Sequence, residues 1–389
     1  MAVRLVAYEV ADLCLGKPPL RFLSSSATVA DALAAIKSSD DNSISVWSCD
    51  HSKTRNLECV CVGKVCMVDI ICYLCREDNL SSPALALKAP VSVLLSKVNG
   101  GLVRHVEPSS SLLEAIDLIL QGAQNLVVPI KTSNSKRKQL QKPSICPTIH
   151  NGQQFCWLTQ EDVIRFLLSS IGLFSSIAAL SIDTLGIIST EFLAVEYHSP
   201  ALSAIEAISR SLTDQTSVAV VEDDGTLIGE ISPITLSCCD ESTAAAIMTL
   251  SAGDLMAYID CGGPPEELVR VVEARLKERN LEGMLEEFMM IINSFNVDMS
   301  NSSSSDDELP SPTTTLSRSR SYNRSGSRMG RTAEAIVCHR GSSLVAVMIQ
   351  AIAHRVNYVW VIEDDCSVVG IVTFANMLEV FRDNLESMI

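Results

Sequence analysis

Hydrophobic and polar positions follow a pattern that recurs along the chain. Two stretches are near copies of each other: residues 220–232 read VVEDDGTLIGEIS and residues 361–373 read VIEDDCSVVGIVT. Each is an apolar run, an acidic turn and a second apolar run with a glycine near its middle, followed by a hydroxyl residue. Two short apolar runs joined by a tight polar turn are typical of a β-hairpin. Self-similarity on this scale predicts a chain built from a repeated unit.

Four amphipathic segments, each introduced by a capping residue, predict the first helix of each repeat. Thr28 precedes VADALAAIK and Ser111 precedes LLEAIDLIL, with an acidic residue three positions after each cap, as in a capping box. Ser199 precedes PALSAIEAI, which has proline at the first helical position, and Ser342 or Ser343 precedes LVAVMIQAIA. Apolar residues recur at helical spacing in all four segments, so one face of each helix should be buried.

Each of these helices is followed by two predicted strands rich in Val and Ile, and the second strand leads into another helix. The predicted strand pairs are Ile44–Cys49 with Cys59–Val65, Leu126–Ile130 with Phe155–Leu158, Ser217–Val221 with Thr226–Ile231, and Tyr358–Ile362 with Val368–Val372. The second helices begin at residues 66–69, 159–162, 232–235 and 373–376. The repeat is therefore helix–strand–strand–helix, and it occurs four times.

The fourth repeat is interrupted between residues 261 and 334. Residues 264–292 carry charged and apolar side chains at helical spacing, which predicts an amphipathic helix. Residues 299–331 are Ser-rich and poor in large apolar side chains, which predicts a disordered linker. The linker is either a plain tether or one regulated by phosphorylation. Candidate phosphorylation sites are Ser305, which precedes three acidic residues, and Ser311, which precedes a proline; the arginines of residues 318–328 could pair with these phosphates.

Composition and charge narrow the classes of function. The chain has 389 residues, 47% of them apolar, and a formal charge of −16. Its length suits two or three domains, and its negative charge opposes nucleic acid and anionic membrane as main partners. The uncharged apolar run at residues 166–182 is short and serine-rich for a membrane span, and the first residues do not resemble a signal peptide. We therefore expect a cytoplasmic protein, with the nucleus as an alternative compartment.

The cysteines and histidines give no support to an enzyme or a metalloprotein. The fourteen cysteines lie in apolar strand-like and helix-like patterns, which favours buried free thiols. Five of them between residues 59 and 75 could also indicate a metal site, and Cys72 and Cys75 a redox pair, but no CxxC pair recurs at zinc-site spacing. The six histidines lie in no catalytic motif, and the chain has no P-loop. We expect no catalytic and no metal-binding residues.

The four repeats resemble the units of the cystathionine-β-synthase-type (CBS) domain family. In that family the unit is β-α-β-β-α, two units form a pseudo-twofold pair called a Bateman module, and adenosyl nucleotides bind between them. The resemblance implies an α+β fold of two modules, with units at residues 10–80, 95–175, 181–250 and 251–389. The opening DLCLGKPPLRFLSSS and the apolar linker 166–182 resemble plant CBS-domain-containing proteins. That group is similar to the γ regulatory subunits of AMP-activated-type kinases, which also have four units.

The family's ligand motif, G-x-[IV]-[ST]-x-x-[DN], implies the candidate site residues. A hydroxyl residue ends a strand at a helix N-terminus, where free N–H groups favour phosphate, and an acidic residue one turn later can accept both ribose hydroxyls. The matching residues are Cys66 and Asp69, Thr159 and Asp162, Ser232, and Thr373 and Asn376. In the second unit Cys156 stands where glycine is usual, and in the third Thr235 replaces the acid. The first module keeps both acids and is the better candidate for binding.

Two functions remain open at this point. The resemblance implies a non-catalytic regulatory protein that binds AMP, ADP, ATP or S-adenosylmethionine as a regulatory ligand, with no required cofactor, and modulates a partner protein such as a protein kinase. The alternative is an interaction scaffold whose sites bind no nucleotide. The Thr159–Asp162 spacing fits either function, because it is also the spacing of a capping box that needs no ligand.

Overall fold

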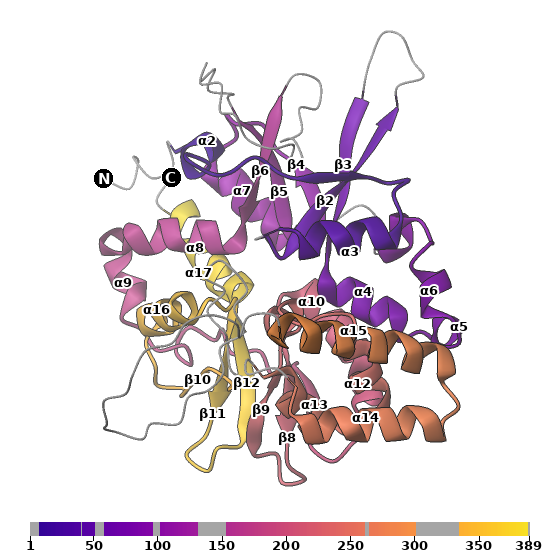
Figure 1. Cartoon of the computed structure of the whole chain (residues 1–389). Helices are drawn as coiled ribbons and strands as arrows, with labels where there is room; N and C mark the ends of the chain where they lie inside the picture. The colour runs from indigo at the N-terminus through magenta and orange to yellow at the C-terminus, as the bar shows by residue number, and fades with distance from the viewer. Residues whose placement is uncertain are drawn as a thin grey trace, which may run out of the picture.

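The computed structural model of the chain describes residues 8–39, 41–50, 58–95, 102–130, 153–260, 264–300 and 334–387. Within these ranges the four predicted repeats are present, and we number them units 1 to 4 in chain order (Figure 1). Ser305, Ser311 and the rest of the predicted linker after residue 300 lie outside the described residues.

Each unit contains a three-stranded sheet whose first two strands are parallel and whose last two strands form an antiparallel hairpin. The strands are β1 (Phe22–Ser24), β2 (Ser43–Asp50) and β3 (Glu58–Cys66) in unit 1; β4 (Val103–His105), β5 (Asn125–Ile130) and β6 (Gln154–Thr159) in unit 2; β7 (Leu193–Glu196), β8 (Val218–Val221) and β9 (Leu227–Ile231) in unit 3; and β10 (Val337–Cys338), β11 (Tyr358–Ile362) and β12 (Val368–Thr373) in unit 4. The limits of every hairpin strand lie within one residue of those predicted. A helical crossover joins each parallel pair, as parallel strands require, so the α+β class and the β-α-β-β-α unit are confirmed.

Two helical segments complete each unit. They are α3 (Val29–Lys37) and α4 (Met67–Leu74) in unit 1, and α7 (Leu112–Leu120) and α8 (Gln160–Ser169) in unit 2. In unit 3 they are η3 (Ala201–Ala204) continued by α10 (Ile205–Asp214), and α11 (Pro233–Ser237); in unit 4 they are α16 (Leu344–His354) and α17 (Phe374–Glu386). Thr28, Ser111 and Ser343 accept the capping hydrogen bonds predicted for them. The prediction for Ser199 is wrong, because unit 3 opens with a 3-10 turn whose Ala201 N–H donates to the carbonyl of Leu250 (2.9 Å).

The units associate in two different ways. The sheets of units 1 and 2 meet around the buried residues Trp47, Cys61 and Val127, and we call this pair module 1. The hairpins of units 3 and 4 are joined by the Leu227 N–H, which donates to the carbonyl of Cys366 (3.0 Å), and this pair is module 2. Helices then join the modules: those of unit 1 share one core with unit 3, and those of unit 2 share another with unit 4. Figure 1 accordingly shows the helices between an upper and a lower pair of sheets.

Segments between the units cross over and complete units other than their chain neighbours. The segment with α2 (Val10–Leu13) precedes β1 and falls within the residues predicted for unit 1, but it packs on unit 2, where Glu9 forms a bridge with Ser111. Residues 181–189 precede β7 and fall within the residues predicted for unit 3, but they pack on unit 4, through bridges to Ser343 and Ile371. The other connecting elements are α5 (Glu77–Leu80), α6 (Pro83–Ala86), η1 (Val91–Leu94), η2 (Ile171–Phe174), α9 (Ser175–Ala178), α12 (Thr243–Thr249) and α13 (Ala252–Ile259). The crossing segments tie the two units of each module together.

The insertion in unit 4 begins with two helices where the sequence predicts one. Helix α14 (Glu266–Glu278) and helix α15 (Glu282–Ser300) are separated at Asn280, whose φ of 55° is left-handed and cannot continue a right-handed helix. Arg275 donates to the carbonyl of Thr249 (2.6 Å) at the C-terminal end of α12, where a cation is favourable. None of the helices that the structure describes is long and apolar enough to cross a membrane.

Amide side chains join three units at the centre of the molecule. Gln215 of unit 3 donates to the carbonyl of Gln124 in unit 2 (3.3 Å) and accepts a hydrogen bond from the Asn357 amide of unit 4 (2.9 Å). Gln215 itself ends α10 in a left-handed conformation, with φ of 56°. Gln124, Gln215 and Asn357 lie just before the central strands β5, β8 and β11. Their hydrogen bonds therefore fix the position of the two modules relative to each other.

Candidate functional site

The predicted site residues lie where the last strand of each unit enters the following helix. In unit 2 the backbone N–H and the hydroxyl of Thr159 both donate to Asp162 Oδ2, and each hydrogen bond is 2.7 Å long. In unit 4 the N–H and the hydroxyl of Thr373 donate to Asn376 Oδ1 in the same way, with lengths of 3.0 Å and 2.7 Å. Both pairs are capping boxes, so one acceptor oxygen of each acid or amide is already used by its own helix.

The junctions of units 1 and 3 differ from this geometry. In unit 1 the N–H of Cys66 donates to Asp69 Oδ2 (2.8 Å), and a thiol takes the place of the hydroxyl. In unit 3 the hydroxyls of Ser232 and Thr235 lie 3.2 Å apart, and both residues are almost completely buried. The structure therefore presents no accessible hydroxyl at the unit 3 junction.

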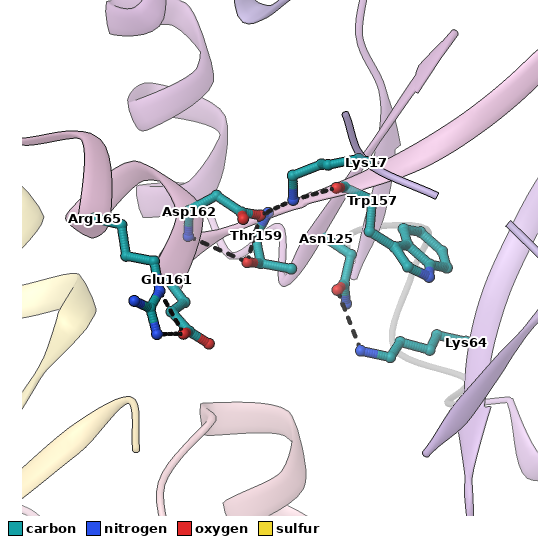
Figure 2. Close-up of polar contacts among 8 residues, drawn as sticks. All are labelled: Lys17, Lys64, Asn125, Trp157, Thr159, Glu161, Asp162 and Arg165. Atoms are coloured by element: carbon teal, nitrogen blue, oxygen red, sulfur yellow. Dashed lines mark hydrogen bonds and ion pairs between the residues drawn. The ribbon is translucent and has the colours of Figure 1, made fainter. Parts of the chain in front are cut away.

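Asp162 has a partner that the sequence did not indicate. Its carboxylate forms an ion pair with Lys17, whose ammonium also donates to the carbonyl of Trp157 (2.9 Å), as Figure 2 shows. Lys17 belongs to the crossing segment before β1. This segment runs beside β6, where the N–H of Leu20 donates to the carbonyl of Phe155 (2.8 Å). No local pattern marks Lys17, because its partner is 145 positions away.

Lys64 is a second residue that sequence reasoning missed. It lies two positions before the end of β3 and points from unit 1 toward unit 2 (Figure 2). Its ammonium lies 3.4 Å from Asn125 Oδ1 and 5.9 Å from the centre of the Trp157 ring. Its side chain is exposed, yet desolvation by the surrounding protein lowers its pKa, and the neighbouring Cys66 and Asp69 oppose that shift. Asn125 is paired with Thr159 in the sheet, so Lys64 links the two junctions of module 1.

The equivalent position in unit 3 holds a carboxylate. Glu230 lies two positions before Ser232, is only 1% exposed, and accepts a hydrogen bond from Ser217 of its own unit (2.8 Å). From unit 4 it accepts further bonds from the Tyr358 hydroxyl (2.9 Å) and the Trp360 indole N–H (2.8 Å). The protein's own side chains therefore fill the space between the units of module 2.

The glycine of the motif lies close against segments that connect the units. A Cβ on Gly63 would lie 2.5 Å from Leu95, and a Cβ on Gly370 would lie 2.5 Å from the carbonyl oxygen of Ser189. In unit 2 Cys156 occupies this position, and its thiol contacts Cys14 of the segment that crosses there. Hydrogen bonding from Cys156 lowers the pKa of the Cys14 thiol. The departure from glycine is thus accommodated by a small residue on the crossing segment.

The cysteine cluster of unit 1 consists largely of thiols enclosed by protein. Cys61 lies on β3 and Cys72 on α4, and desolvation raises the pKa of each thiol to about 12. Thiols with such pKa values are poor nucleophiles and poor metal ligands at neutral pH. Within the described ranges, no three His, Cys, Asp or Glu residues are grouped so that they could hold a metal ion.

Asp69 titrates at an unusual pH, which predicts a specific pH dependence of stability. Burial raises its pKa from 3.8 to about 6, against the opposing effect of the hydrogen bonds from Cys66. Between pH 4 and 6 the folded state binds more protons than the unfolded state, so this group costs stability as the pH rises through that window. One pKa unit is worth about 1.4 kcal/mol, and because Asp69 is only half-buried we expect a total cost of about 1–2 kcal/mol above pH 6.

The free energy of unfolding of Asp69→Asn, relative to that of the parent, should therefore be about 1–2 kcal/mol higher at pH 7.5 than at pH 4. Urea unfolding at both pH values measures it. Asp31→Asn is the matched control, because hydrogen bonds from Thr28 lower the pKa of Asp31 and predict the opposite sign. Equal differences between Asp69→Asn and the parent at both pH values would contradict the prediction.

These features define a four-unit CBS architecture. The chain is 52% identical over 398 residues to an Arabidopsis thaliana protein named CBS domain-containing protein CBSX5, with 100% of both chains covered. It is 30% identical to the Arabidopsis CBS domain-containing protein CBSX6, over 97% of this chain and 94% of that one. The chain belongs to the CBS domain-containing protein family.

More distant comparisons relate the chain to γ-like proteins. It is 21% identical to an Arabidopsis protein named SNF1-related protein kinase regulatory subunit gamma-like PV42b, over 99% of this chain and 97% of that one. A solved structure from Methanocaldococcus jannaschii, described as a candidate archaeal homologue of γ-AMPK, has a TM-score of 0.53 at 14% identity and covers 96% of this chain and 100% of its own. That likeness shows the same fold. No protein-family model matches the chain.

Proposed function

We propose that module 1 binds an adenosyl nucleotide between units 1 and 2, and that the bound state modulates a partner protein, with a protein kinase as the candidate. The observation that carries the proposal is the contrast between the two modules. Thr159, Asp162 and Lys64 of module 1 reach solvent, whereas Ser232 and Glu230 of module 2 are buried. The kinase partner is supported by the relative named as a gamma-like regulatory subunit of a SNF1-related protein kinase.

Asp162 can serve a ligand and its own helix together. Oδ2 accepts the capping bonds, while Oδ1 accepts no hydrogen bond from any residue that the structure describes. A carboxylate is acceptor-only, so Oδ1 suits a ribose hydroxyl. The neighbouring N-terminus of α8 favours an anion through its free N–H groups.

A ligand at these junctions can change how the modules pack. Helix α4 starts at the unit 1 junction and packs on unit 3, and α8 starts at the unit 2 junction and packs on α16 and α17 of unit 4. A ligand shifts such an equilibrium only if it binds one arrangement of the units more tightly than the other. The surface offered to a partner would then depend on nucleotide concentration.

An interaction scaffold that binds no nucleotide is the second candidate function. The observation that favours it is the ion pair of Lys17 with Asp162, because it occupies the carboxylate that would hold the ribose. A ligand would have to share this carboxylate with Lys17 or displace the ammonium.

Thermal unfolding of the full chain with AMP, ADP, ATP or S-adenosylmethionine separates the two functions. A nucleotide at a hundredfold excess over its dissociation constant should stabilise the protein by about 2.7 kcal/mol. Asp162→Ala should abolish this stabilisation. Asp31→Ala removes an identical capping box at α3, with hydrogen bonds of 2.9 and 2.7 Å, and should leave the stabilisation intact. A parent protein that responds to no nucleotide would support the scaffold.

A further inference from the structure

One strand position carries opposite charges in the two modules. Lys64 in unit 1 and Glu230 in unit 3 each lie two residues before the residue that caps the following helix, Cys66 or Ser232, and point toward the partner unit. Both contact the first residue of the partner's central strand, Asn125 for Lys64 and Tyr358 for Glu230. The position therefore decides the charge of the space between the units.

The two charges are satisfied to different extents. Glu230 is 1% exposed and accepts hydrogen bonds from the hydroxyl of Ser217 and from the aromatic side chains of Tyr358 and Trp360 in unit 4. Lys64 is exposed and forms no ion pair with any residue that the structure describes. Its contacts are an amide oxygen and an indole ring, and the carboxylates of Asp69 and Asp41 act on its charge without forming an ion pair with it. The nearby carboxylate of Asp69 accepts the hydrogen bond from Cys66.

The chemistry of this position selects among adenosyl ligands. A phosphate supplies the anion that Lys64 lacks, and the N-terminus of α4, which begins three residues after Lys64, favours the same charge. The sulfonium of S-adenosylmethionine would instead be repelled by the ammonium. A nucleoside without phosphate would leave Lys64 unpaired.

We propose that Lys64 is the phosphate-binding residue of module 1, and that the ligand is a phosphorylated adenosine nucleotide and not S-adenosylmethionine. This inference rests on the proposed nucleotide site and adds the class of ligand and the residue that selects it. Module 2 takes no such ligand, because Glu230 would repel a phosphate and its neighbours fill the space. One nucleotide should therefore bind each chain.

Calorimetric titration of the full chain with AMP, adenosine and S-adenosylmethionine tests this assignment. AMP should bind at least tenfold more tightly than either of the others, with a stoichiometry of one. Lys64→Gln should weaken AMP binding about tenfold and leave adenosine binding unchanged, because only the phosphate contact is lost. Lys88→Gln replaces an exposed lysine between α6 and η1 and should change neither affinity.

The outcomes separate this inference from the proposed function. Binding of AMP that depends on Asp162 but not on Lys64 would overturn the role of Lys64 while leaving the nucleotide site in place. S-adenosylmethionine binding as tightly as AMP, or an equal loss of AMP and adenosine binding in Lys64→Gln, would also overturn it. Absence of binding by every ligand would remove the site and the inference together.

Discussion

Glu230→Ala is expected to lower the free energy of unfolding by about 3–5 kcal/mol, the largest effect we predict for a single substitution. The carboxylate is 1% exposed and accepts hydrogen bonds of 2.8 to 2.9 Å from Ser217, Tyr358 and Trp360. Removing the common acceptor leaves buried donors without partners, and each such group costs about 1–3 kcal/mol. Because two of the donors come from unit 4, the loss should weaken the association of units 3 and 4.

Urea unfolding followed by tryptophan fluorescence measures this effect, since Trp360 is itself one of the donors. Asp223→Ala is the matched control, because Asp223 is an exposed carboxylate at the tip of the same hairpin and should change stability by no more than about 0.5 kcal/mol. Glu230→Gln should fall between the two, since an amide offers one acceptor oxygen in place of two. A Glu230→Ala variant as stable as Asp223→Ala would show that these hydrogen bonds contribute little.

Gly370→Ala is expected to lower the free energy of unfolding by about 1–3 kcal/mol. The new Cβ would lie 2.5 Å from the carbonyl oxygen of Ser189 and 2.7 Å from a methyl group of Ile188. Ser189 cannot move aside freely, because its N–H and carbonyl both bond to Ile371 over 2.9 Å. Overpacking against fixed backbone typically costs energy of this size.

Gly341→Ala provides the control for this substitution. A Cβ on Gly341 meets nothing within 4 Å, so its replacement should be close to neutral. Comparing the urea midpoints of the two variants isolates the effect of the close approach from that of losing a glycine. Equal midpoints would mean that the crossing segment 181–189 is not held tightly against β12.

Local patterns in the sequence were sufficient for the units themselves. Strands of period 2, helices of period 3.6 and capping residues such as Thr28 and Ser343 all arise from interactions within a few positions, so the chain carries them in readable form. The two places where the observed helices differ from the predicted ones also have local causes. A 3-10 turn at Ala201 replaced the helix start predicted at Ser199, and a left-handed Asn280 divided the insertion helix.

The candidate site was only partly accessible from the sequence. The motif located Thr159, Asp162 and Asp69, because strand-to-helix junctions are marked by short spacings. It did not indicate Lys17 or Lys64, since each acts on another unit: Lys17 reaches Asp162 across 145 positions, and Lys64 reaches Asn125 across 61.

The sequence by itself determined that this protein is a fourfold repeat with a strand-to-helix junction in each unit, because those features depend on near neighbours in the chain. The tertiary structure alone decided which segment completes which unit and what faces the space inside each module. Glu230 and Lys64 occupy equivalent strand positions, yet one is enclosed by Tyr358 and Trp360 while the other reaches solvent. That difference arises from contacts between units far apart in the chain, which no local pattern records.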